Sequence, residues 1–102
     1  MTTMLHWNDI KPLLSEVDLF KAMTQAFIAH DKGQSIIPPV GELCFSEPPG
    51  DVHIKYGALV KGAHYVVKIA SGFYENPLKG LPSSQGMMVL FDQRSGVLKA
   101  IL

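Results

Sequence analysis

The sequence lacks several features that would place its 102 residues in a common functional class. Cys44 is the only cysteine, so no internal disulfide can form and a cytoplasmic location is expected. Nine basic residues balance nine acidic ones. This balance argues against a nucleic-acid partner, because such a protein needs a basic surface. No apolar run approaches membrane-spanning length and no secretory signal is visible, so no membrane partner is predicted.

Motifs of nucleotide and metal chemistry are also absent. Neither the GxGxxG dinucleotide fingerprint nor the Gly-Lys-Ser/Thr ending of a phosphate loop occurs. The histidines show no metal-ligand spacing and are interpreted as surface or hydrogen-bonded residues. We therefore predict no catalytic, cofactor-binding or metal-binding residue in the chain itself. The histidines are His6, His30, His53 and His64.

The hydrophobic pattern predicts helices first and strands afterwards. A short helix capped by Asn8 is expected over residues 9–14, and a longer one over residues 16–32, ended by Gly33. The aromatic residues of this segment, including Trp7, are expected in the core, with Cys44 as a small apolar filler. Alternation and turn signals predict strands over residues 35–37, 40–45, 52–58, 65–70, 87–91 and 97–102.

This order of elements predicts an α+β fold. The N-terminal helices are expected to pack on one face of a curved, mostly antiparallel sheet. A chain of this length forms one domain at most, residues 1–102. The sequence ends at Leu102 inside a predicted strand. This ending favours an incomplete domain whose sheet continues elsewhere.

The stretch from residue 66 to residue 86 carries the candidate site. Lys68 lies within the apolar strand VVKIA, and a lysine in such surroundings is rarely buried without an anionic partner. A loop rich in glycine, proline and serine is predicted over residues 71–86. Two interpretations stay open. Either Lys68 binds a substrate carboxylate beside a functional loop, or it lies on a solvated sheet face and the loop only connects strands.

The same stretch resembles a known enzyme family. The motifs VVKIASGF, NPxxGLPS and GxxxLFDxxSG, in this order, resemble the ornithine cyclodeaminase and mu-crystallin family. The resemblance is strong over residues 50–102 and weak over the rest of the chain. Members of the family are NAD- or NADP-dependent enzymes that act on amino acids or imino acids. They are typically homodimers with a substrate-binding and dimerisation domain and an inserted Rossmann domain.

The resemblance implies that this chain is the N-terminal substrate-binding and dimerisation portion of such an enzyme, without the nucleotide-binding domain. Lys68 matches the strand lysine that helps to hold the substrate carboxylate, and Ser83 falls where many members have a threonine lining the site. Val40 stands where many members carry arginine or lysine. These 102 residues are not expected to turn over alone. The alternative is a stand-alone homo-oligomeric module that binds a small ligand or serves assembly, without catalysis.

Overall fold

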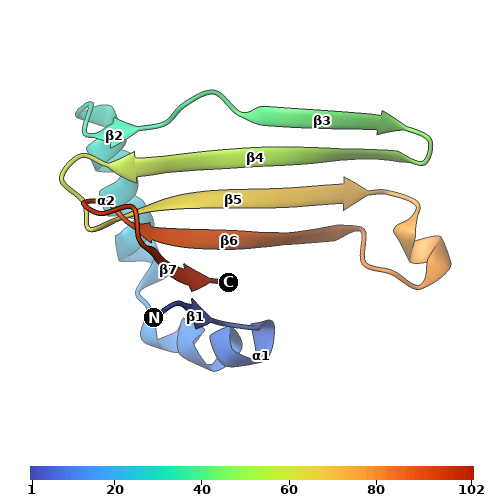
Figure 1. Cartoon of the computed structure of the whole chain (residues 1–102), viewed down its shortest axis with the longest axis horizontal. Coiled ribbons are helices and arrows are strands. Elements are labelled where there is room, and N and C mark those ends of the chain that lie inside the picture. The colour runs from blue at the N-terminus through green and yellow to red at the C-terminus, as the bar shows by residue number, and fades with distance from the viewer.

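The fold is built around one mixed sheet. A computed structural model describes all of residues 1–102 and has seven strands in the order β1-β7-β6-β5-β4-β2, with β3 also paired to β4 (Figure 1). All neighbouring strands are antiparallel except β1 and β7, which are parallel. The prediction of a mostly antiparallel sheet is confirmed. The strands are β1 (Thr3–Met4), β2 (Ser35–Ile36), β3 (Gly41–Ser46), β4 (Pro49–Leu59), β5 (His64–Phe73), β6 (Ser84–Asp92) and β7 (Leu98–Ile101).

The first helical segment differs from its prediction. α1 (Trp7–Ile10) is a single turn that continues into a 3₁₀ helix, η1 (Lys11–Glu16). Asn8 does not cap it. His6 holds the N-cap position, and the Asp9 carboxylate accepts the His6 backbone N–H at 2.9 Å. The acidic residue at the third helical position therefore fixes the start of the helix.

The second helix is present but shorter than predicted. α2 (Leu19–Asp31) begins after Asp18, whose Oδ1 accepts the backbone N–H of Lys21 at 2.9 Å. This cap excludes residue 16 from the helix. Gly33, at a φ of 69°, follows the end of the helix as expected. Neither α-helix has the length and apolar character needed to cross a membrane.

The loop between β5 and β6 is shorter than predicted. Both strands extend into it, leaving residues 74–83 and a 3₁₀ helix, η2 (Asn76–Lys79). The sequence misleads here because Gly86 belongs to a strand, although it resembles a loop residue. A Cβ atom at this glycine would lie 2.5 Å from the backbone oxygen of Ile69. Glycine is thus required by the close approach of β5 and β6.

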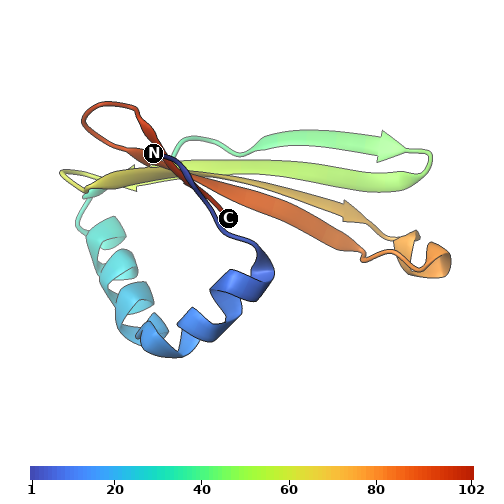
Figure 2. The ribbon, with the colours of Figure 1, turned by 60° about the horizontal axis from the view of Figure 1, so that its bottom comes forward.

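The helices α1, η1 and α2 lie on one side of the sheet, whereas η2 lies at its end between β5 and β6 (Figure 2). We call that side the helix face. Two cavities identify it, because each is lined both by residues of a helix and by residues of the strands. The opposite side, the open face, is covered by no helix. The helix face carries Val66, Lys68 and Met88, and the open face carries Val67 and Val89.

The chain buries very little of itself. Only Gly50 and Ala100 are buried, and the radius of gyration is 15.9 Å. A compact domain of this length has about 13 Å. The predicted aromatic core is therefore wrong, since Trp7, Phe20 and Phe27 are 60%, 84% and 74% exposed.

The physical reason lies in how α2 meets the sheet. It shares a cavity with the sheet through Ala26 and His30, so its aromatic residues do not point at the strands. Cys44 is also exposed on β3, which contradicts its prediction as an apolar filler.

Candidate functional site

Lys68 lies at the middle of β5, on the helix face. It lines a cavity of about 430 Å³ between the sheet and the first helical segment. Its side chain is exposed, and no ion pair of the structure involves it. The other residues lining this cavity are almost all apolar and include Trp7, Ile10, Leu14, Met88 and Leu102.

Strand geometry explains how one charge enters this apolar cavity. Side chains alternate between the two faces of a strand, so Lys68 points opposite to its neighbours Val67 and Ile69. Its partner on β6 is Met88. The backbone of Met88 in turn exchanges two 2.8 Å hydrogen bonds with Leu102. The cavity floor is therefore set by three adjacent strand segments.

The arrangement suits a small carboxylate. An ammonium group offers three N–H donors and a full positive charge, and apolar walls hold the uncharged part of a ligand. Trp7, which we expected to lie in a core, forms part of this wall together with Ile10. The chemistry available here is binding and orientation.

Ser83 does not lie beside Lys68. It precedes β6, and its backbone oxygen accepts the N–H of Phe73 at 2.8 Å. The partner of Lys68 on β6 is Met88, five positions further along. At about 3.4 Å per residue, the separation is roughly 17 Å. Val40 is exposed just before β3 and lines none of the cavities described.

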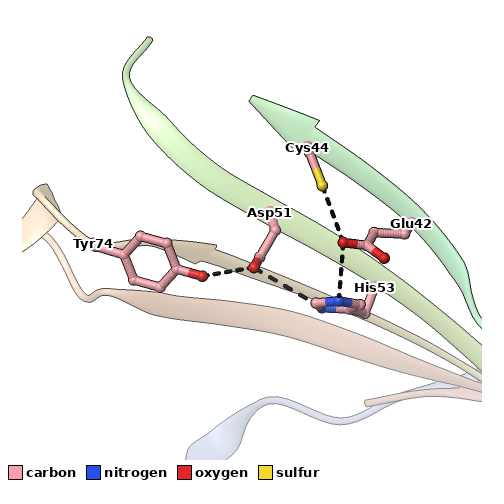
Figure 3. A network of polar contacts seen from close by, with 5 residues as sticks. All are labelled: Glu42, Cys44, Asp51, His53 and Tyr74. Carbon is pink, nitrogen blue, oxygen red and sulfur yellow. Dashed lines mark hydrogen bonds and ion pairs between the residues drawn. The ribbon is translucent and has the colours of Figure 1, made fainter. Parts of the chain in front are cut away.

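A second group of polar side chains lies on the helix face towards the other end of the sheet (Figure 3). Tyr74 donates from its hydroxyl to Asp51 Oδ2 at 2.6 Å. The His53 ring lies 3.9 Å from Asp51 Oδ1 and 3.8 Å from Glu42 Oε1. The Cys44 thiol donates to Glu42 Oε1 at 3.0 Å. We call these five residues the polar network.

Hydrogen bonding raises the pKa of two members of the polar network. The bond to Glu42 raises the pKa of the Cys44 thiol above its ordinary value, and the nearby carboxylates add to this shift. The bond to Asp51 raises the pKa of the Tyr74 hydroxyl in the same way. Both groups are therefore kept protonated. No group of three or more histidine, cysteine, aspartate or glutamate side chains in the structure is placed to hold a metal ion.

Sequence reasoning did not find the polar network. The alternation of Asp51 and His53 with apolar residues was visible, and it places both side chains on one face. Their neighbours come from β3 and from the residue after β5, and the sequence does not reveal this pairing. In the register of β3 with β4, Glu42 faces His53 and Cys44 faces Asp51.

The residues of this chain do not fit a dinucleotide. Such a site needs a strand, a glycine-rich turn and then a helix whose N-terminus meets the pyrophosphate. In this chain β1 is connected to α1 by Leu5 and His6, and this connection contains no glycine. The later strands are joined by turns or by the 3₁₀ helix η2.

The fold and the cavity define a class of protein. It is an α+β domain in which one ammonium group lines an otherwise apolar cleft between a sheet and helices. The sequence profile of the ornithine cyclodeaminase/mu-crystallin family matches residues 1–102. The chain belongs to this family.

Individual relatives show how much of a family member the chain represents. It is 33% identical over 96 residues to an uncharacterized cyclodeaminase of Sinorhizobium fredii, covering 93% of this chain and 28% of the relative. It is 33% identical over 98 residues to a Delta(1)-pyrroline-2-carboxylate reductase of Paracoccus denitrificans, covering 96% and 29%. An archaeal alanine dehydrogenase dimer with bound NAD superposes with a TM-score of 0.88 at 26% identity, covering 98% and 30%. The chain thus spans less than a third of these relatives.

Proposed function

We propose that this chain is the N-terminal substrate-binding and dimerisation portion of an NAD- or NADP-dependent enzyme that acts on an amino acid or an imino acid. The observation that carries the proposal is the unpaired Lys68 ammonium in an otherwise apolar cavity of about 430 Å³. Family membership supports it, since named relatives include a pyrroline-2-carboxylate reductase and an alanine dehydrogenase.

In this proposal Lys68 binds the substrate carboxylate. A charge-assisted hydrogen bond from the ammonium fixes that end of the substrate, while Trp7 and Leu14 enclose its apolar part. Ser83 lies roughly 17 Å along the sheet from Lys68, so it is proposed to line a different part of the substrate site of the complete enzyme, outside this cavity. The nucleotide would be bound by residues outside these 102, because the chain has no element that fits it. Residues 1–102 alone are therefore proposed to bind without turnover.

The open face is proposed to pair with a second copy. Apolar side chains cross it in rows from strand to strand, one of which is Tyr56, Val67, Val89 and Ile101. Tyr65 and Phe91 stack in the next row, with ring centroids 4.9 Å apart. A broad apolar surface without a covering layer favours association. The dimer named for the alanine dehydrogenase supports the same proposal.

The test is Lys68→Met in the protein expressed from its complete gene. L-Alanine, L-ornithine and Δ1-pyrroline-2-carboxylate are assayed with NAD(H) and NADP(H). We expect KM for the accepted substrate to rise about tenfold or more, because a charge-assisted hydrogen bond contributes roughly 1.5–3 kcal/mol. Lys99→Met, on β7, is the matched control and should leave KM unchanged.

Each other result has a definite meaning. Unchanged KM and kcat in Lys68→Met would remove the proposed role of Lys68. Binding of one of these compounds without any turnover of the complete protein would favour the stand-alone binding module. That alternative is supported by the lack of a dinucleotide-binding element in these residues.

A further inference from the structure

Lys68 has a second lysine directly opposite it. In the antiparallel register of β4 with β5, the partner of Lys68 is Lys55. Directly opposed residues of an antiparallel pair project from the same face, with Cβ atoms about 4.5–5.5 Å apart. Both lysine side chains therefore start from adjacent positions on the helix face of the sheet.

This placement is unfavourable unless something compensates for it. Like charges directly opposite each other on adjacent strands destabilise a sheet. Neither lysine has a carboxylate oxygen within ion-pair distance, since all ion pairs of the protein involve His6 or His53. Both side chains are exposed, so solvent screens the repulsion between their charges. The loss of sheet stability is therefore small while no ligand is bound.

The acidic side chains of β3 and β4 on the same face of the sheet are already engaged. On β4, Asp51 accepts the Tyr74 hydroxyl and contacts His53. On β3, Glu42 accepts the Cys44 thiol and also contacts His53. The polar network thus satisfies these carboxylates within itself, and the lysine pair is left for an anion from outside the chain.

We propose that Lys55 and Lys68 form a two-ammonium clamp for one carboxylate, each lysine donating to one of its two oxygens. The proposal rests on the proposed function and adds Lys55 as a second substrate-binding residue. Two donors rising from adjacent strands fix the plane of the carboxylate, whereas one flexible ammonium fixes only its position. A bound carboxylate also removes the repulsion between the lysines, so binding and sheet stability are coupled.

Oxalate is the probe, because it presents carboxylates without an amino group or an apolar body. Its dissociation constant is measured by calorimetric titration at low salt in the protein from the complete gene. We expect Lys55→Met and Lys68→Met each to weaken binding about tenfold or more. Lys99→Met, which removes the same net charge elsewhere, should change it by less than about twofold. Lys55→Arg keeps the charge and should keep binding, which separates loss of the clamp from misfolding.

The outcomes separate this proposal from the proposed function. If both lysine variants lose oxalate but the wild type binds no amino acid or imino acid, the clamp stands and the proposed function fails. If Lys68→Met alone weakens substrate and oxalate binding while Lys55→Met matches the wild type, the clamp is overturned and the proposed function stands. Absence of oxalate binding by the wild type, or equal losses in Lys99→Met, also overturns the clamp.

Discussion

Single residues of this protein are held by short-range hydrogen bonds far more than by burial. Asp92, at the turn before β7, is the clearest case. Its Oδ1 accepts the backbone N–H groups of Ser95 and Arg94 at 2.8 and 2.9 Å, and the Ser95 hydroxyl at 2.9 Å. These bonds to the charged form, led by the backbone of Ser95, lower the pKa of Asp92.

The lowered pKa of Asp92 predicts a pH dependence of stability. A carboxyl whose folded pKa lies below its unfolded value of about 3.9 stabilises the fold at higher pH. That contribution is lost as the pH falls through the folded pKa. We expect Asp92→Asn to be less stable than the wild type at neutral pH, with the difference shrinking below about pH 4. Urea unfolding of both proteins across this range measures it, and a constant or growing difference would refute the prediction.

The residues of the site were only partly predictable. Lys68 stood out because it interrupts an apolar strand, and its apolar cavity wall agrees with that signal. Lys55 gave no comparable signal, since it alternates with Ile54 and Tyr56 as any solvated lysine does. Its significance comes from the residue opposite, and the register of two strands is fixed by three-dimensional pairing.

At the scale of elements, the type and order of helices and strands were readable, but their ends were not. Asp18 and Asp9 set the starts of α2 and α1 through hydrogen bonds to backbone N–H groups. Several residues nearby had equally suitable side chains. Gly86 shows the opposite difficulty, because a residue typical of loops lies in a strand where two backbones approach closely.

The cap of α2 gives a prediction at this scale. Asp18→Ala removes the acceptor for the Lys21 N–H and should lower the free energy of unfolding by about 1 kcal/mol. Asp18→Ser restores an acceptor at the same position and should recover most of the loss. Urea unfolding measures both variants. Equal stability of Asp18→Ala and the wild type would show that the cap contributes nothing in this context.

At the scale of the whole molecule, the fold class could be predicted and the core could not. Helical spacing of Phe20 and Phe27 is normally a sign of core packing, yet both are exposed. The spacing identifies a face that needs a partner but does not say whether that partner is the same chain. Strand alternation has the same limit, because it predicted two faces and left open which one is covered.

The open face gives a prediction about assembly. Val67→Lys places a charge at the centre of the apolar row that also contains Tyr56 and Val89. We expect it to shift the protein from dimer to monomer in sedimentation velocity, because an interface core excludes unpaired charges. Val66→Lys, one residue away on the helix face, is the matched control and should stay dimeric. A dimer that survives Val67→Lys would place the interface elsewhere.

The parallel pairing of β1 with β7 has a consequence for biosynthesis. Thr3 pairs with Ala100 and Met4 with Ile101, so β1 gains its pairing partner only after about a hundred further residues have been synthesised. Throughout synthesis of the residues between them, β1 has no strand to pair with. Closing so long a segment has an entropic cost that only the finished sheet offsets. The part of the cavity around Lys68 that Trp7 and Leu102 line therefore forms only after β7 has been synthesised, although Trp7 is translated much earlier.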